Sequence, residues 1–191
     1  GIGLSGASPS GALEINSDTG YSELQGVSNR AEIIDFSISP ITPNAFRLIE
    51  VRGDYVYITM DRGFVIYDVS DIDGGGPLEE GRIEDGQNAN FNSLAGSLGL
   101  ELDGDYAYIS STQDSALTII DVSNPSNPTF ISKLQDGVNG FNFLQGCYKC
   151  EVAGGLLYVT GHGDGAITIV DVSNPATPQL RSVILDGVNG I

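Results

Sequence analysis

The stretch Leu117–Pro125 reads Leu-Thr-Ile-Ile-Asp-Val-Ser-Asn-Pro, and it returns at Ile167–Pro175 as Ile-Thr-Ile-Val-Asp-Val-Ser-Asn-Pro. A shorter copy, Ile-Tyr-Asp-Val-Ser, stands at Ile66–Ser70. The continuous run of apolar and β-branched residues predicts a strand that is buried on both faces, and Asn-Pro predicts the turn that follows it. Three copies of one strand-and-turn unit predict a repeat architecture.

A second block recurs ahead of each copy in the same order. Glu50, Glu101 and Glu151 each stand just before a tight Gly turn and the strand of alternating aromatic and apolar residues that follows it, and they lie 51 and 50 residues apart. Four short strands fit into each repeat, and that content is typical of a β-propeller blade. We therefore expect an all-β fold of four-stranded antiparallel blades, because a single such sheet cannot bury both of its apolar faces alone.

The repeat divides the chain into four parts. Residues 43–91, 92–141 and 142–191 are the three expected blades, and residues 1–42 form an N-terminal segment that can be interpreted as the remnant of a preceding blade. Propellers close with about four to eight blades. We therefore expect these blades to belong to a larger chain or to a ring closed by association of copies, and we do not expect a free monomer.

The net charge and the hydrophobic pattern limit the kinds of partner that the protein can bind. The 191 residues include 25 Asp and Glu against 8 Lys and Arg, a formal net charge of −17. Such a charge opposes binding to nucleic acid, and no apolar run is long enough to span a membrane. The scarcity of lysine beside abundant Asp, Gly, Asn and Ser favours a secreted or cell-surface protein.

The repeated strands resemble those of the LVIVD-repeat family. Members pair a Gly-Asp-Tyr-Ala-Tyr-Val-like strand with a Leu-x-Ile-x-Asp-Val-Ser-x-Pro strand, and both stand here at Gly104–Ile109 and Leu117–Pro125. The resemblance implies an extracytoplasmic β-propeller of bacteria or archaea, and it carries no shared catalytic residues. The repeat is longer here than in ordinary members, and the first unit has Asp71–Gly76 where the others have Asn-Pro.

The recurring aspartates Asp68, Asp121 and Asp171 are interpreted as structural residues. A carboxylate at the end of a strand is well placed to accept N–H groups of the following turn. The glutamates that open the repeats are expected to line one face of the ring, to pair with arginine or to be solvated. Repetition in every unit argues against a catalytic role for either set.

Metal binding is a more specific hypothesis, but the sequence supports it less strongly. Asp71 and Asp73 place two carboxylates at alternate positions before a glycine, as calcium loops do, without the third acid and distal glutamate of an EF-hand. Asp103, Asp105 and Asp164 are weaker calcium candidates of the same kind, and the competing interpretation is ordinary Asp-Gly turn chemistry. No other cofactor is indicated.

The cysteines Cys147 and Cys150 form a lone Cys-x-x-Cys motif. A redox site would need a strand-to-helix turn, and a zinc site would need a second ligand pair. We therefore predict a local disulfide that fixes the segment between blades. His162 lies in a Gly-rich hairpin, and the sequence has no Gly-x-Ser-x-Gly nucleophile elbow that would support a catalytic role for it. We therefore expect His162 to lie at the hairpin tip.

Three functions remain open, with no catalytic or cofactor-binding residue predicted. The first is a non-enzymatic extracellular scaffold or interaction module that binds protein, itself, the rest of a parent chain or glycan. The second is a ligand-binding, calcium-binding or enzymatic propeller whose channel site is completed by further blades. The third is a subunit of an extracellular fibre, because exposed edges and faces permit open association.

Overall fold

The computed structural model describes residues 13–16, 21–24 and 45–187. In the N-terminal part, β1 (Leu13–Asn16) pairs with β2 (Tyr21–Leu24) as an antiparallel hairpin. The interpretation of segment 1–42 as a remnant blade falls mostly outside the described residues. We therefore take the fold from residues 45–187.

Residues 45–187 form three antiparallel sheets, each a meander of four consecutive strands. Blade 1 contains β3 (Phe46–Arg52), β4 (Tyr55–Met60), β5 (Gly63–Asp68) and β6 (Leu78–Glu84). Blade 2 contains β7 (Ser97–Asp103), β8 (Tyr106–Ser111), β9 (Ala116–Asp121) and β10 (Thr129–Gln135). Blade 3 contains β11 (Cys147–Ala153), β12 (Leu156–Gly161), β13 (Ala166–Asp171) and β14 (Gln179–Leu185).

The three sheets share one register, which follows from the repeat. In each blade the tyrosine of the second strand lies opposite an isoleucine of the third, as Tyr57 does opposite Ile66. A bulge recurs at the same place between the third and fourth strands of each blade. Gly53, Gly104 and Gly154 occupy the tight turn between the first two strands with positive φ, a conformation that favours glycine.

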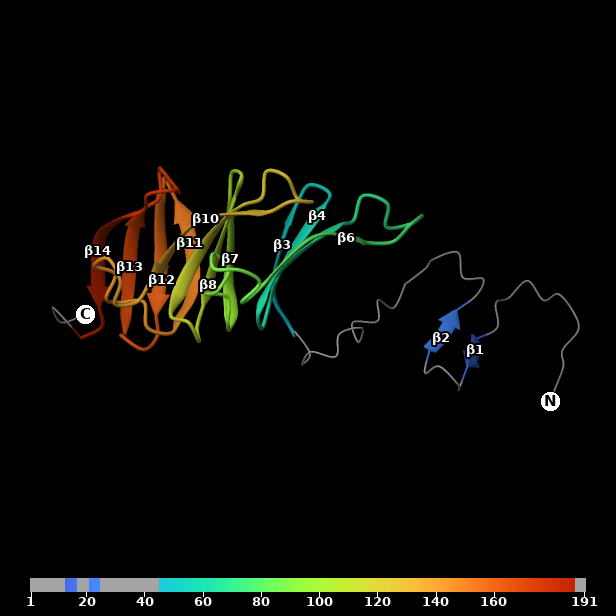
Figure 1. The fold of residues 1–191 in the computed structure, drawn as a ribbon, viewed down its shortest axis with the longest axis horizontal. Helices are drawn as coiled ribbons and strands as arrows, with labels where there is room; N and C mark the ends of the chain where they lie inside the picture. The colour runs from blue at the N-terminus through green and yellow to red at the C-terminus, as the bar shows by residue number, and fades with distance from the viewer. Residues whose placement is uncertain (1–12, 17–20, 25–44, 188–191) are drawn as a thin grey trace, which may run out of the picture.

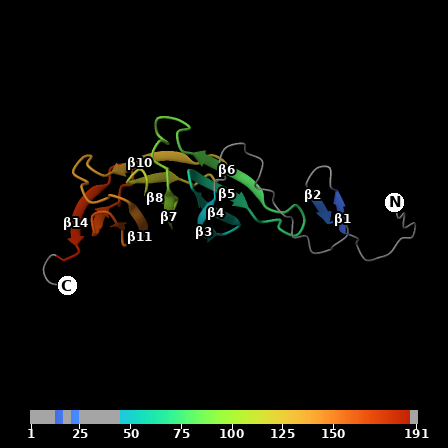
Figure 2. The same cartoon turned by 90° about the horizontal axis from the view of Figure 1, so that it is seen from below.

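The blades stack face to face in an open arc (Figure 1). The first strands β3, β7 and β11 contact one another from blade to blade, so they are the inner strands of the arc. The fourth strands β6, β10 and β14 are edge strands on the outer side (Figure 2). The expected all-β blade architecture is therefore confirmed, and within the described residues no sheet closes the arc into a ring.

Most of the core lies in layers between blades. One layer lies between blades 1 and 2, with Phe64 and Ile120 among its members, and another lies between blades 2 and 3, with Leu117 and Val170. A third, smaller cluster, formed by Ile58, Met60, Val65 and Tyr67, lies on the face of blade 1 that is turned away from blade 2. The connecting segments 85–96 and 136–146 contain the predicted boundaries at 91/92 and 141/142. The described part of the chain has no helix, and so none that could span a bilayer.

Candidate functional site

The two apolar interfaces inside the stack use the same register positions of successive blades. We call the face of a blade that is turned toward the following blade its forward face, and the opposite face its rear face. The forward-face residues are Tyr57, Phe64, Ile66 and Ile83 in blade 1 and Tyr108, Leu117, Ile119 and Leu134 in blade 2. The rear-face residues are Ala107, Ile109, Ile120 and Val122 in blade 2 and Leu157, Val159, Val170 and Val172 in blade 3.

The forward face of blade 3 repeats this composition, and no described strand packs on it. Its residues are Tyr158, Ile167, Ile169 and Ile184, in the register of the forward face of blade 2. Ile167 is 37% exposed and Ile184 is 48% exposed, whereas the aligned Leu117 and Leu134 are 0% and 2% exposed. The forward face of blade 3 is therefore an apolar surface of the kind that blade 2 buries.

The rear face of blade 1 exposes apolar side chains at its inner strand, whereas Ile58, Met60, Val65 and Tyr67 farther out form a cluster that is 9% exposed or less. Ile49 is 61% exposed, whereas the aligned Leu100 of blade 2 is 3% exposed. Farther out, Met60 is buried beneath Arg82, whose guanidinium lies 3.4 Å from the sulfur and also binds Glu79. The Arg82–Glu79 ion pair therefore covers part of the rear face of blade 1.

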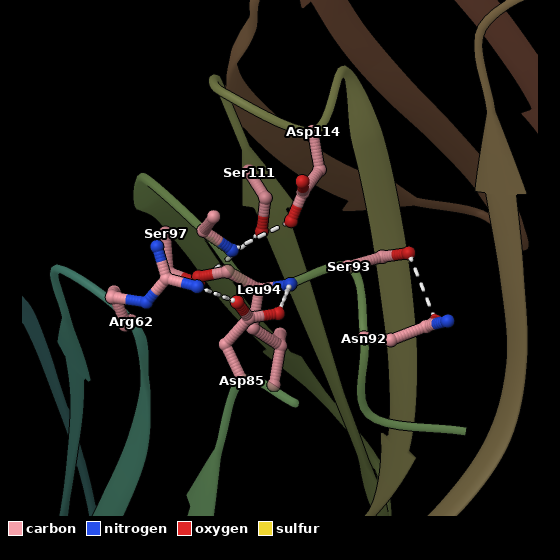
Figure 3. Close-up of polar contacts among 9 residues, drawn as sticks. Arg62, Asp85, Asn92, Ser93, Leu94, Ser97, Ser111 and Asp114 are labelled. Carbon is pink, nitrogen blue, oxygen red and sulfur yellow. Dashed lines mark hydrogen bonds and ion pairs between the residues drawn. The ribbon is translucent and has the colours of Figure 1, made fainter. Parts of the chain in front are cut away.

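Two aspartates hold the segment that connects blades 1 and 2 (Figure 3). The Leu94 N–H donates to Asp85 at the end of blade 1, at 3.0 Å, and the Ala95 N–H donates to Asp114 in a hairpin of blade 2, at 2.7 Å. The Asp85 side chain is 7% exposed and pairs with Arg62 at 2.5 Å. One carboxylate from each blade therefore accepts a hydrogen bond from the backbone of the connecting segment.

Short polar side chains complete this junction (Figure 3). The Ser97 hydroxyl donates to the Leu94 carbonyl at 2.7 Å and lies 3.2 Å from the Ser111 hydroxyl. The Lys133 ammonium donates to Asn92 and Ser93 at 2.7 and 3.1 Å. The junction is satisfied internally, with no buried side-chain N or O left without a partner among the described residues.

The next junction repeats the aspartate pair. Leu144 N–H donates to Asp136 at 3.0 Å, and Gln145 N–H donates to Asp164 at 2.8 Å. In both junctions a threonine hydroxyl of the following blade binds the connecting backbone: Thr118 reaches Ser93 O, and Thr168 reaches Phe143 O at 2.9 Å. These roles were missed in the sequence, although the matched spacing of the Asp-Gly and hairpin aspartates was a usable signal.

The outer rim of each interface joins a fourth strand to the turn of the following blade. The Ser132 hydroxyl of blade 2 donates to the carbonyl of Pro175 in blade 3 at 2.6 Å. At the first interface Gly81 takes this position, and a Cβ there would lie 2.2 Å from the Pro125 carbonyl oxygen. The Asn-Pro turn is therefore a contact element between blades as well as a turn.

The strand-end aspartates all make the same local contact. Asp68, Asp121 and Asp171 accept the N–H of the serine two residues later, at 2.7, 2.8 and 2.9 Å. Asp171 also accepts from Arg181, and this hydrogen bond, followed by those from Ser173, lowers the pKa of Asp171 to about 2. The geometry is that of a carboxylate that shapes a turn.

The proposed calcium ligands Asp71 and Asp73 lie in the exposed turn after β5. The Asp71 backbone carbonyl accepts the N–H groups of Gly74, Gly75 and Gly76. Residues 45–187 hold no group of three or more His, Cys, Asp or Glu side chains arranged to bind a metal. Calcium binding by this pair remains a prediction.

The predicted disulfide between Cys147 and Cys150 is absent, and both are free, buried thiols. A bulge between them places both in the layer between blades 2 and 3. Their sulfurs donate to different carbonyls, Cys147 to Ala116 at 2.9 Å and Cys150 to Tyr108 at 3.4 Å. Burial raises the pKa of Cys147 to about 11 and raises that of Cys150, so neither has the character of a reactive thiolate.

The inner strands bring the repeated glutamates near one another. Burial raises the pKa of Glu101, and the nearby carboxylates of Glu151 and Glu50 raise it further. A hydrogen bond from the Val152 N–H acts in the opposite direction. His162 lies apart from these carboxylates, in the hairpin turn between β12 and β13.

Comparison with known families gives one match. The sequence model of the family described as LVIVD repeat matches residues 47–72, 97–136 and 149–186, which together make up more than half of the chain. The three matched regions fall on blades 1, 2 and 3 respectively. No curated protein matches the chain.

Solved structures similar to this chain are larger. A Lactobacillus plantarum protein and the Pseudomonas aeruginosa periplasmic gluconolactonase PpgL each match with a TM-score of 0.60, at 17% and 12% identity. Both matches cover 92% of this chain and 50% of the other. Kluyveromyces lactis Hsv2 matches with a TM-score of 0.45 and 14% identity, over 74% of this chain and 37% of its own. At these identities the first two show the propeller fold alone, and the chain spans half their length or less in all three.

Proposed function

Since the chain belongs to the LVIVD-repeat family, we propose that it is a non-enzymatic β-propeller scaffold that binds protein through the exposed apolar side chains of its blade stack. The bound protein is another chain, a further copy or the rest of a parent protein. The observation that carries this proposal is the exposed forward face of blade 3. Exposed apolar surfaces of this kind mark interaction sites in soluble proteins.

The use of the polar residues supports a scaffold. Asp68, Asp121 and Asp171 bind turn backbone, while the four aspartates of the junctions bind connecting backbone. These recurring aspartates thus hold the architecture in place.

A place outside the cytoplasm is part of the same proposal. The net charge of −17 and the small number of basic residues support a secreted or cell-surface module. Fractionation of the source cells tests this, and recovery of the protein in the cytoplasm alone would contradict it.

Association of the 191-residue chain tests the scaffold function. We expect a sedimentation mass above 20 kDa, and we expect Ile184→Asp to lower it by placing a charge on the forward face of blade 3. Thr177→Asp, on an exposed turn of blade 3, is the control for added charge. A 20 kDa particle for the unmodified chain at all concentrations would overturn the proposal.

A ligand site at the inner strands is the second candidate, although the described glutamates there do not form a ready metal-binding group. Burial raises the pKa of Glu101, the carboxylates of Glu151 and Glu50 raise it further, and a bound cation would relieve their repulsion. Calorimetric titration with calcium distinguishes the candidates. Heat that Glu101→Gln removes would favour the inner strands, heat that Asp71→Asn removes would favour the blade 1 turn, and no heat would favour the scaffold.

A further inference from the structure

The outer edge of each blade is its fourth strand, and the three edges carry different side chains (Figure 2). An edge strand presents N–H and C=O groups that can pair with a strand of another chain, and charged side chains and bulges are the usual protection against such pairing. The charged residues of these edges are Glu79, Glu80, Arg82 and Glu84 in β6, Lys133 in β10 and Arg181 in β14. Within the described residues no strand pairs with the outer side of β14.

The hydrogen bond that ends β14 shows which of its residues face outward. Successive residues of an antiparallel strand point their N–H and C=O groups alternately toward one side and the other. The Asp186 N–H donates to the Gly165 carbonyl at 2.8 Å, so residue 186 points into its own sheet. Val183 and Leu185 therefore point their backbone groups outward. The bulge opposite the step from Ile169 to Val170 interrupts the alternation before residue 182, so residues 182–186 form the regular part of this edge.

Blades 1 and 2 have charged or polar residues at the outward-facing positions. By the same alternation these positions are Arg82 and Glu84 in β6, and Lys133 and Gln135 in β10. The outward N–H of Glu84 is already bound, because it donates to the Gln87 side chain at 3.3 Å. Blade 3 has two apolar residues at these positions. The edge of blade 3 therefore lacks the protection that the other two edges have.

Residues 182–186 are also complementary to a second copy of themselves. In a two-fold antiparallel pair centred on Ile184, Val183 of each copy lies opposite Leu185 of the other, and their outward N–H and C=O groups face each other. Ile184, which is 48% exposed, then lies beside the same residue of the second copy. Ser182 lies opposite Asp186, so a hydroxyl donor faces an exposed carboxylate. This register places no like charges opposite each other.

We propose that residues 182–186 of β14 pair with the same segment of a second copy of this chain, so that two blade 3 sheets join edge to edge. This inference rests on the proposed scaffold function, and it names the partner and a strand edge as the contact. A contact that uses the same patch on both copies closes on itself. The pairing therefore produces a dimer and not a fibre.

A cysteine at the centre of the pair tests the contact directly. The two Ile184 residues would form a non-hydrogen-bonded pair with Cα atoms about 4.5 Å apart, a separation that a disulfide can span. We expect Ile184→Cys to form a covalent dimer when oxidised glutathione accepts the electrons of the two thiols. The unmodified chain, whose own cysteines are buried, is the background control.

A second cysteine variant distinguishes the edge from the face of blade 3. Ile167→Cys is exposed on the neighbouring strand β13, opposite Ile184, and it lies one strand away from the proposed contact. We expect it to give no more covalent dimer than the unmodified chain. Equal crosslinking of the two variants, or none at position 184, would overturn the proposal.

Charge at position 182 tests the register. Ser182→Asp places carboxylates opposite each other at two symmetry-related points and should weaken the dimer roughly tenfold, whereas Ser182→Lys should not weaken it. Thr177→Asp and Thr177→Lys, on an exposed turn of blade 3, make the same changes in net charge. Sedimentation at about 0.15 M salt, where long-range repulsion is screened, measures the dissociation constants. The same response at positions 182 and 177 would overturn the register.

Amide hydrogen exchange separates failure of this inference from failure of the scaffold function. The Val183 and Leu185 N–H groups point away from their own sheet, so we expect them to exchange slowly in the dimer and quickly on dilution. A chain that associates but leaves these two amides fast to exchange would keep the scaffold function and overturn the edge contact. A chain that stays at 20 kDa at all concentrations would overturn both.

Discussion

Blades 2 and 3 present nearly the same forward face in two different situations. Leu117 is 0% exposed beneath blade 3, whereas Ile167, at the aligned position, is 37% exposed because no described sheet covers it. The sequence around the two residues is almost identical. The comparison teaches that burial in this protein depends on the neighbouring blade, and that the same residues serve as core in one place and as contact surface in the other.

The strongest test of this comparison removes the two aligned side chains one at a time. Leu117→Ala should lower the free energy of unfolding by about 2–5 kcal/mol, because it leaves a cavity between blades. Ile167→Ala should cost less than about 1 kcal/mol, because water already reaches that side chain. Chemical denaturation measures both, and equal losses would break the distinction between the two faces.

The junction aspartates give the next largest effect. Asp136→Ala leaves the Leu144 N–H without its acceptor and should cost about 1–3 kcal/mol. Asp186, exposed after β14, stands where Asp136 stands after β10, and Asp186→Ala should change stability by less than about 0.5 kcal/mol. Thermal unfolding compares the pair, and a large loss at Asp186 would mean that its carboxylate is already engaged.

The smallest expected effect concerns Asp171, at the end of β13, and depends on pH. The pKa of Asp171 is lowered to about 2, first by the Arg181 hydrogen bond and then by the Ser173 contacts. A carboxyl group with a lowered folded-state pKa stabilises the fold above its unfolded pKa, which is ordinarily near 3.8, and loses that contribution as the pH falls through about 2.

Carbon NMR titration of the Asp171 carboxyl tests this assignment. We expect Arg181→Ala to move its pKa upward toward the ordinary value, without restoring that value fully, because the Ser173 N–H remains. Asp68 is the internal comparison, since its lowered pKa comes from Ser70 without an arginine. An unchanged Asp171 pKa in the variant would contradict the role given to Arg181.

The sequence predicted the architecture well, and the reason is that the repeat states the same strand pattern three times. The alternation around Tyr106 and the run at Leu117–Asp121 are enough to predict neighbouring strands of one blade. The site was harder to predict. Asp85 and Asp114 come from two different blades, and both accept hydrogen bonds from the backbone of the segment that connects them. Neither residue is distinctive in the sequence alone.

The cysteine pair shows where the sequence argument failed. Cys147 and Cys150 are close in sequence, and a disulfide was the simplest prediction. The bulge and the packing of β11 against blade 2 instead give each sulfur its own backbone carbonyl to bind. Local spacing does not reveal the hydrogen-bond acceptors that a neighbouring sheet provides.

By itself, the order of residues determined that this chain makes four-stranded blades, because hydrophobic alternation and turn chemistry act within a few residues. Only the tertiary structure decided which apolar faces meet, which aspartates bind across a junction and how far each blade face is exposed. Those features arise between sheets that are distant in sequence, where packing and solvent exclusion set the energy of each contact.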